Sequence, residues 1–349
     1  MDYREKKLYD FLVNCMEIDN KPTLNEKLNI FIKLVSSWKK GNDDSDNTTN
    51  NNRITIWERN LTQIRESISL DRARYYINRM IKSLTLTNVG KVNDIDFGNW
   101  KEYEDILTDS LWLFEKRDRT LSHNASYWGN FIPQIPNQLI RRFTKKGETV
   151  LDPFLGSGTT AIESLGLQRN CIGVDISQDQ IAHSRELTES VDRKNVFLEL
   201  IRGDSAEVDF KKLLSEHDLQ SVQLAILHPP YWDIIKFNEE EGNLSGAPSL
   251  EEFRSMFSKV LTNVLRVLEK GRFLAIVIGD SYRKGEWIPI GFYLMDDAMK
   301  MGLKLKSIVV KNYSDTKAKR QSSQLWRYRA LKGNFYVFKH EYIFIFKKP

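Results

Sequence analysis

Short apolar runs alternate with amphipathic stretches from residue 149 to near the end of the chain. This alternation is typical of a series of βαβ units, in which helices connect parallel strands. We expect strands at residues 149–152, 171–175, 196–201, 224–227, 273–278, 303–310 and 342–346, with helices between them. The pattern predicts an α/β fold with a doubly wound sheet.

The first hundred or so residues follow a helical period instead. Leu8, Leu12 and Cys15 recur with the spacing of one helix face, and a similar pattern covers residues 56–84. The segment 41–53 between these patterns contains no apolar residue. Because such a segment has nothing to bury, we expect it to be an exposed, flexible loop.

A length of 349 residues is typical of two domains rather than one. The change from a helical period to a βαβ pattern suggests where the chain divides. We expect a helical N-terminal domain over residues 1–115 and an α/β domain over residues 116–349.

Composition excludes several classes of protein. The two cysteines, Cys15 and Cys171, cannot form a disulfide framework and belong to no C-x-x-C pair, so we expect a reducing cytoplasm and no metal site. The N-terminus lacks the apolar core of a signal peptide, and no apolar run reaches the roughly 18 residues of a membrane helix. We therefore expect no membrane association. The net charge of +5 permits a polyanionic partner without requiring one.

A glycine-rich turn follows the first predicted strand of the α/β domain. Gly156 and Gly158 allow a tight turn and a close approach to a ligand, and the next helix offers unpaired N–H groups at its N-terminus. The turn lacks the Gly-Lys-Ser/Thr of a P-loop and the third glycine of the dinucleotide motif, which disfavours a pyrophosphate ligand. We expect a nucleotide-like cofactor to contact Asp152, Pro153, Phe154, Gly156, Ser157, Gly158, Thr159 and Thr160.

Two further acidic residues follow the next two predicted strands. Asp175, with Ile176 beside it, stands where a carboxylate commonly accepts hydrogen bonds from ribose hydroxyls. Asp204 and Ser205 come after the third strand, within reach of an adenine amino group. Together with the glycine turn, these residues predict a site shaped for an adenosine.

The fourth predicted strand ends in His-Pro-Pro-Tyr-Trp at residues 228–232. In order with DPFLGSGTT at 152–160, GVDIS at 173–177 and GDS at 203–205, this motif resembles the S-adenosylmethionine-dependent DNA amino-methyltransferases. These site-specific modification methylases act on cytosine N4 or adenine N6. The resemblance implies S-adenosylmethionine as the cofactor and double-stranded DNA, with the target base flipped out, as the substrate.

The resemblance covers the chain from about Ser122 to its end. The segment 130–140 is similar to the family's cofactor-binding segment, which adds Asn130 and Phe131 to the expected cofactor contacts. The segment 339–346 is similar to the family's last strand. The implied fold is the Rossmann-like sheet of class I methyltransferases, with seven strands and the last one antiparallel.

The chemistry of methyl transfer explains the motif at 228–232. An exocyclic amine is a poor nucleophile because its lone pair is delocalised into the ring, so two acceptors must hold its N–H groups in line with the methyl group. The resemblance assigns these roles to His228 and to a backbone carbonyl of Pro229-Pro230. Tyr231 would stack on the extruded base, and Trp232 would help to form the pocket.

The histidine at position 228 departs from the family, which has serine for N4-cytosine and aspartate or asparagine for adenine. A neutral imidazole can accept one hydrogen bond, so the role remains open to it. Tryptophan after Pro-Pro-Tyr favours cytosine N4, with adenine N6 as the alternative. Two other hypotheses are an RNA amino-methyltransferase and a catalytically silent nucleic-acid-binding subunit.

The charge of the chain is concentrated near its C-terminus. Residues 311–332 have a net charge of +6, and the rest of the chain sums to −1. Basic residues interleaved with aromatic ones suit a loop that contacts phosphates and bases. We expect DNA contacts from Lys319, Arg320, Trp326, Arg327 and Arg329.

Three further expectations concern the remaining parts of the chain. Asp280, after the fifth predicted strand, either lines the base pocket or caps the next turn. The helical N-terminal domain would position DNA or a partner. The family resemblance also allows a companion restriction endonuclease and a prokaryotic cytosol as the location.

Overall fold

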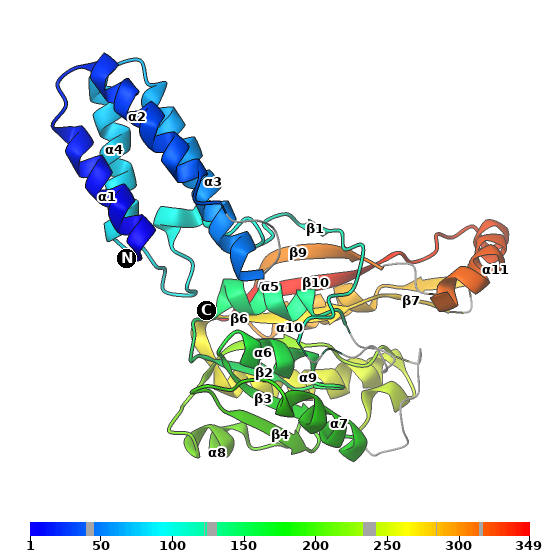
Figure 1. Cartoon of the computed structure of the whole chain (residues 1–349). Coiled ribbons are helices and arrows are strands. Elements are labelled where there is room, and N and C mark those ends of the chain that lie inside the picture. Colours follow the sequence, from blue (N-terminus) through cyan, green and yellow to red (C-terminus); the bar gives the residue numbers. More distant parts are fainter. Residues whose placement is uncertain (40–44, 122, 124–130, 233–241, 284, 314–316) are drawn as a thin grey trace. The chain divides into compact units, whose positions relative to one another are not determined.

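The structure of the chain is a computed structural model, shown in Figure 1. It describes residues 1–39, 45–121, 123, 131–232, 242–283, 285–313 and 317–349, with the backbone alone at 45–50 and 317–323. The chain forms two compact units. The first comprises Met1–Lys91 and Ile95–Asp105, and the second comprises Val92–Asp94 and Ile106–Pro349. This division lies ahead of the domain boundary that we expected after residue 115.

In its described residues, the first unit contains four α-helices. They are α1 (Tyr3–Met16), α2 (Lys21–Ser36), α3 (Ser45–Arg65) and α4 (Leu70–Thr85), followed by the short 3-10 helix η1 (Phe97–Glu102). The apolar faces of the four helices share one core, to which Leu12, Leu28, Leu61 and Ile77 each contribute a fully buried side chain. The predicted helical character of this region is therefore seen in the structure.

The expected loop at 41–53 is in part wrong, because α3 begins at Ser45. The second half of this helix is anchored in the core by Ile54, Trp57 and Leu61. Helix formation is cooperative, and each residue added to an existing helix gains one backbone hydrogen bond. Polar residues ahead of an anchored segment can thus continue the helix without burying anything.

Over the part of the chain that the structure describes, the second unit is built on an eight-stranded sheet. Its strand order is β1-β9-β10-β6-β5-β2-β3-β4, and a separate hairpin pairs β7 with β8. The strands are β1 (Leu111–Trp112), β2 (Thr149–Asp152), β3 (Asn170–Asp175), β4 (Leu198–Arg202), β5 (Val222–Leu227), β6 (Leu268–Ile278), β7 (Ser281–Arg283), β8 (Glu286–Ile288), β9 (Lys304–Asn312) and β10 (His340–Lys347).

The seven expected strands are all present in this sheet, and β10 is antiparallel to both of its neighbours, β6 and β9. The pairs among β2, β3, β4, β5 and β6 are parallel. The fold is the expected Rossmann-like, doubly wound sheet. The short β1, which pairs with β9, adds an eighth strand that the sequence patterns did not indicate.

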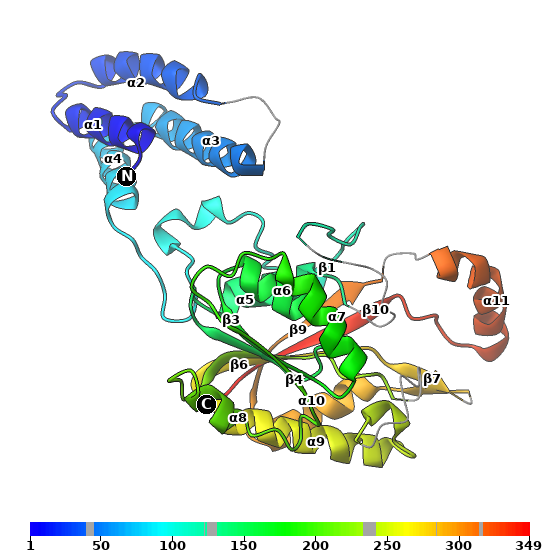
Figure 2. The same cartoon turned by 60° about the horizontal axis from the view of Figure 1, so that its bottom comes forward.

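Helices cover both faces of the sheet, as Figure 2 shows. One face packs against α8 (Phe210–Ser215), α9 (Leu250–Val267) and α10 (Ile290–Lys300). The other face is covered by α5 (Gln134–Phe143), α6 (Thr159–Gly166) and α7 (Gln178–Glu189). Successive strand residues alternate between the two cores, so that Leu151 faces the first core and Val150 the second. Both faces are buried, as a parallel sheet requires.

The basic stretch near the C-terminus forms a helix, α11 (Lys317–Gly333), where we expected a loop. Its composition explains the difference, because Ala, Leu, Lys, Arg and Gln are strong helix formers and the stretch contains neither proline nor an internal glycine. Figure 1 shows α11 beside the β7–β8 hairpin. Beyond the end of α11, the ring of Phe335 stacks on that of Tyr282 in β7, with centroids 3.9 Å apart.

Candidate active site at the carboxyl edge of the sheet

The carboxyl ends of five neighbouring strands carry the residues that the sequence analysis singled out. Asp152 ends β2 and Asp175 ends β3, while Asp204 follows β4, His228 follows β5 and Asp280 follows β6. Ligands of open α/β sheets bind at this edge, close to the point where the strand order reverses. That point lies between β2 and β5, so the glycine turn and His228 come from the two strands flanking it.

The glycine turn between β2 and α6 depends on two residues with left-handed backbone angles. Gly156 has φ +54° and Gly158 has φ +82°. A β-carbon at Gly158 would lie 3.0 Å from the side chain of Ser184 on α7, whose hydroxyl donates a hydrogen bond of 2.9 Å to the carbonyl of Gly156. The second glycine is therefore required both by the backbone and by the close packing of α7 against the turn.

Asp175 braces the same turn from the end of β3. Its carboxylate accepts hydrogen bonds from the backbone N–H of Gly156 at 2.8 Å and from that of Ser177 at 2.9 Å. Each carboxylate oxygen can accept more than one hydrogen bond, and the side chain is partly exposed. The arrangement leaves Asp175 suited to a ribose hydroxyl while it also shapes the turn.

Asp152 is fully buried at the end of β2. Burial raises the pKa of its carboxyl group to about 7, although the Thr160 side chain and the Phe154 N–H both act to lower it. The hydrogen bond from Phe154 N to Asp152 Oδ1 is 2.9 Å long. The Asp152 side chain therefore stabilises the turn from inside the protein and is not exposed at the surface of the site.

Asp204 and Ser205 connect the end of β4 to the glycine turn. The Ser205 hydroxyl donates to the carbonyl of Pro153 at 2.6 Å, and one oxygen of Asp204 accepts from the N–H of Ala206 at 2.8 Å. Gly242 approaches the other oxygen of Asp204 so closely that a β-carbon there would lie 2.7 Å from it. A partly exposed carboxylate at this place has the acceptor chemistry that an adenine amino group needs.

His228 lies at the start of the Pro-Pro-Tyr segment, against aromatic neighbours. Its ring meets that of Phe131 nearly at right angles, with centroids 4.8 Å apart, and that of Tyr231 likewise at 5.8 Å. Burial lowers the pKa of the imidazole to about 4, with Glu341 acting to raise it and Lys311 to lower it. The imidazole is thus neutral at physiological pH and able to accept a hydrogen bond.

The other predicted residues of this region have well-defined contacts. Trp232 is buried and donates from Nε1 to the carbonyl of Ala247 at 3.1 Å, and the guanidinium of Arg283 lies 5.2 Å from its ring centroid. Asp280 accepts from Trp287 Nε1 at 3.0 Å and from the N–H of Gly291 at 3.1 Å. Through these bonds Asp280 joins the β7–β8 hairpin to the first turn of α10.

Part of the predicted site falls where the structure gives no description. Asn130 lies outside the described residues, and Lys319 and Arg320 are described by their backbone alone within α11. Further along this helix Trp326 is 41% exposed, and the guanidinium of Arg329 lies 5.1 Å from its ring centroid. Arg327 is exposed as well.

The sequence analysis missed a pair of buried charges behind Tyr231. Glu341 of β10 and Lys311 of β9 form an ion pair of 2.8 Å, and the Tyr231 hydroxyl donates to Glu341 at 2.9 Å. Each charge adjoins an apolar run, Ile308–Val310 before Lys311 and Tyr342–Phe346 after Glu341, and this is the signal that could have identified them.

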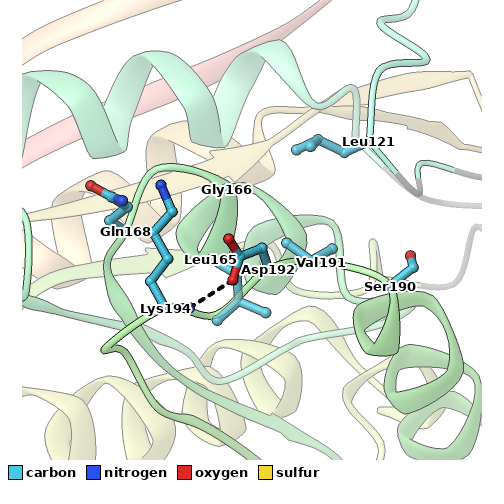
Figure 3. Close-up of a pocket in the computed structure, with 8 residues that line it drawn as sticks. All are labelled: Leu121, Leu165, Gly166, Gln168, Ser190, Val191, Asp192 and Lys194. Carbon is cyan, nitrogen blue, oxygen red and sulfur yellow. Dashed lines mark hydrogen bonds between the residues drawn. The ribbon is translucent and has the colours of Figure 1, made fainter.

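A pocket of about 400 Å³ lies elsewhere in the second unit, as Figure 3 shows. Its lining includes Gly166 at the end of α6 and Val191 and Lys194 beyond the end of α7. These residues precede β3 and β4, so the pocket lies at the opposite edge of the sheet from the carboxyl ends. It contains none of the predicted site residues.

The described residues contain no cluster of His, Cys, Asp or Glu side chains able to hold a metal ion. Among the helices of the described parts, none combines the length and the apolar character needed to cross a membrane.

Comparison with known proteins gives a family match over most of the chain. A family model described as DNA methylase, of the N6/N4 type, matches residues 11–186 and 222–349. The match includes the glycine turn, the His-Pro-Pro-Tyr segment and most of the helical first unit.

Individual relatives match over shorter segments. Two Type II methyltransferases of Methanocaldococcus jannaschii, M.MjaI and M.MjaII, are 38% and 36% identical over 22% and 23% of this chain. The Type II methyltransferase M.BglI of Bacillus subtilis is 30% identical over 30% of this chain. The chain spans 26%, 17% and 28% of the length of these three relatives, respectively.

Proposed function

Because the chain belongs to the N6/N4 DNA methylase family, we propose that it transfers a methyl group from S-adenosylmethionine to an exocyclic amine of a flipped DNA base. The observation that carries this proposal is the position of the His228 imidazole. It is neutral, it follows the strand next to the glycine turn, and it lies against Phe131 of the segment ahead of α5.

The residues at the carboxyl edge fit the cofactor of this family. A left-handed glycine turn precedes a helix N-terminus, and two partly exposed carboxylates, Asp175 and Asp204, follow the next two strands. These are acceptors of the kind that ribose hydroxyls and an adenine amino group require. When bound, S-adenosylmethionine supplies a methyl group attached to a positively charged sulfur, which is a strong electrophile.

The protein's own groups prepare the nucleophile. In this proposal the imidazole of His228 accepts a hydrogen bond from one N–H group of the target amine. A backbone carbonyl of Pro229-Pro230 accepts a hydrogen bond from the other N–H group. The fixed φ angles of the prolines hold that carbonyl rigidly. The amine nitrogen is thereby oriented for in-line attack, and Tyr231 stacks on the extruded base.

Cytosine N4 is the favoured target, with adenine N6 as the alternative. Tryptophan after Pro-Pro-Tyr supports cytosine, and Trp232 is buried beside that segment with its indole N–H bonded to Ala247. Histidine at position 228 is compatible with either base, because a neutral imidazole accepts a hydrogen bond from any amino group.

DNA is proposed to contact α11 and its surroundings. The exposed Arg327 and Arg329 would neutralise phosphates, and the half-exposed Trp326 would reach bases, with Lys319 and Arg320 continuing the basic character along the helix. The description of the relatives as Type II methyltransferases supports a further proposal, that the protein protects DNA against a companion restriction endonuclease.

The test is incorporation of labelled methyl groups. Purified protein and labelled S-adenosylmethionine are incubated with unmodified genomic DNA or with total RNA, and the products are treated with nucleases. We expect label that only deoxyribonuclease removes, recovered as N4-methylcytosine after digestion to nucleosides. Recovery as N6-methyladenine would select the alternative base, label in RNA would change the substrate, and no label in either polymer would favour a silent binding subunit.

A further inference from the structure

Glu341 and Lys311 form an ion pair inside the second unit. They are direct cross-strand partners on the antiparallel strands β10 and β9, and their charged atoms are 2.8 Å apart. Glu341 is 3% exposed and Lys311 is 4% exposed. Removing two charges from water is costly, and an apolar pair of similar volume often serves stability equally well. The position of the pair therefore calls for a reason other than stability.

The carboxylate of Glu341 reaches the candidate active site through Tyr231. One oxygen accepts from Lys311, and the other accepts from the Tyr231 hydroxyl at 2.9 Å. The hydroxyl of Tyr313 lies 3.5 Å from that of Tyr231, and the Lys311 ammonium lies 5.1 Å from the Tyr313 ring centroid. The pair is thus joined directly to the tyrosine of the His-Pro-Pro-Tyr segment.

The ring of Tyr231 is bounded by its neighbours as well. It stands nearly perpendicular to the imidazole of His228, at 89°, with centroids 5.8 Å apart. Gly279, just after β6, leaves room for the ring because it has no side chain. A β-carbon at this position would lie 3.2 Å from Tyr231 Cε2. Burial and the neighbouring Glu341 raise the pKa of the Tyr231 phenol well above its usual value, so the hydroxyl remains a donor.

We propose that Glu341, held in place by Lys311, is a positioning residue that fixes the orientation of Tyr231 beside His228 for stacking on the flipped base. The inference rests on the proposed function and adds two residues to it. Glu341 lies in the segment 339–346 and Lys311 begins the basic stretch 311–332, and the sequence patterns assigned a role to neither residue. The ion pair keeps the acceptor of the Tyr231 hydroxyl in one place, so the ring is oriented before the base arrives.

The first experiment compares single-turnover methylation of genomic DNA by three variants. Tyr231→Phe keeps the ring and loses the hydroxyl, Glu341→Gln keeps an acceptor without the charge, and Lys311→Met/Glu341→Leu replaces the pair by apolar residues. We expect a fall of tenfold or more in the rate for Tyr231→Phe and for the double replacement, a smaller fall for Glu341→Gln, and an unchanged KM for S-adenosylmethionine.

A purely structural pair would behave differently in combination with Tyr231→Phe. If Glu341 acts through the Tyr231 hydroxyl, adding Lys311→Met/Glu341→Leu to Tyr231→Phe lowers the rate little further, because the hydroxyl is already absent. If the fold-losses in rate of Tyr231→Phe and of Lys311→Met/Glu341→Leu multiply in the variant that carries all three substitutions, the inference is overturned. Asp297→Asn is the matched control, because it removes the acid of another ion pair, Arg254–Asp297, which joins α9 to α10. We expect no change in its rate.

A second experiment does not depend on activity. Nitration by tetranitromethane, followed residue by residue with mass spectrometry, reports how accessible and how acidic each tyrosine is. Relative to the exposed Tyr336, we expect Tyr231 to react several-fold faster in Lys311→Met/Glu341→Leu than in the wild type. An unchanged ratio would overturn the positioning inference. Absence of methyl transfer by the wild type would instead overturn the proposed function, so the two failures are distinguishable.

Discussion

The aromatic ring of Phe131 meets the imidazole of His228 nearly at right angles, with centroids 4.8 Å apart. Phe131 precedes α5, whereas His228 follows β5, so the contact joins two distant parts of the sequence. It packs one side of the imidazole with an apolar ring. Burial lowers the pKa of this imidazole to about 4 and so favours its neutral form.

Replacing His228 by alanine should remove methyl transfer while leaving the cofactor site intact. We expect the single-turnover rate to fall by a factor of about 100 or more, because the reacting amine would no longer be held in line with the methyl group. Calorimetric titration with S-adenosylmethionine should give an affinity within a few-fold of the wild type. A variant that keeps its rate would exclude His228 from the mechanism.

The pH dependence of the rate should report the neutral imidazole. With a pKa lowered to about 4, His228 can accept a hydrogen bond at any pH well above that value, and it loses this capacity only as the pH falls through about 4. Lys311→Met removes a cation that lowers this pKa and leaves Glu341, which raises it. We therefore expect the acid limb of the rate profile to move to higher pH in Lys311→Met.

The control for this shift is Lys306→Met, which removes a charge from an exposed position of the same strand. Its acid limb should coincide with that of the wild type. The same displacement in both variants would show that net charge, rather than the buried pair, governs the profile.

Gly158→Ala should weaken both the fold and the cofactor site. The residue has φ +82°, and its new β-carbon would lie 3.0 Å from Ser184. Gly147→Ala is the matched control, because Gly147 has φ +78° but nothing within 4 Å of a β-carbon. Urea denaturation should show that Gly158→Ala costs about 1–2 kcal/mol more than the control, and only Gly158→Ala should lose cofactor affinity. Equal losses of stability in Gly158→Ala and Gly147→Ala would mean that α7 moves away from the new β-carbon at no cost in free energy.

Removing the positive charges of Arg327 and Arg329 on α11 should make DNA binding less dependent on the salt concentration. If Arg327 and Arg329 each neutralise one phosphate, Arg327→Gln/Arg329→Gln should reduce the slope of log K against log salt by about 1.8. Fluorescence anisotropy with duplex DNA measures this slope. The control, Lys211→Gln/Lys259→Gln, removes the same charge from exposed positions on α8 and α9 and should leave the slope unchanged. A slope unaffected by the arginine changes would exclude these two residues as phosphate contacts.

Local patterns explain what was predictable here. The apolar runs and the turn residues after them predicted the central strands, and parallel strands bring the residues at their carboxyl ends to one edge. Asp152, Asp175, Asp204 and His228 could therefore be grouped without coordinates. The polar composition of 45–53 and the basic composition of 317–333 both misled, because neither excludes a helix that is anchored elsewhere or favoured by its residues.

The order of the motifs, the family and the type of fold were determined by the sequence alone, because each depends on residue type and spacing along the chain. The partners of those motifs were decided only by the tertiary structure. Glu341 reaches Tyr231 because the register of β10 against β9 places it opposite Lys311, and Phe131 reaches His228 through the packing of the segment ahead of α5. Such contacts depend on strand pairing and core packing across the whole unit, which no local period encodes.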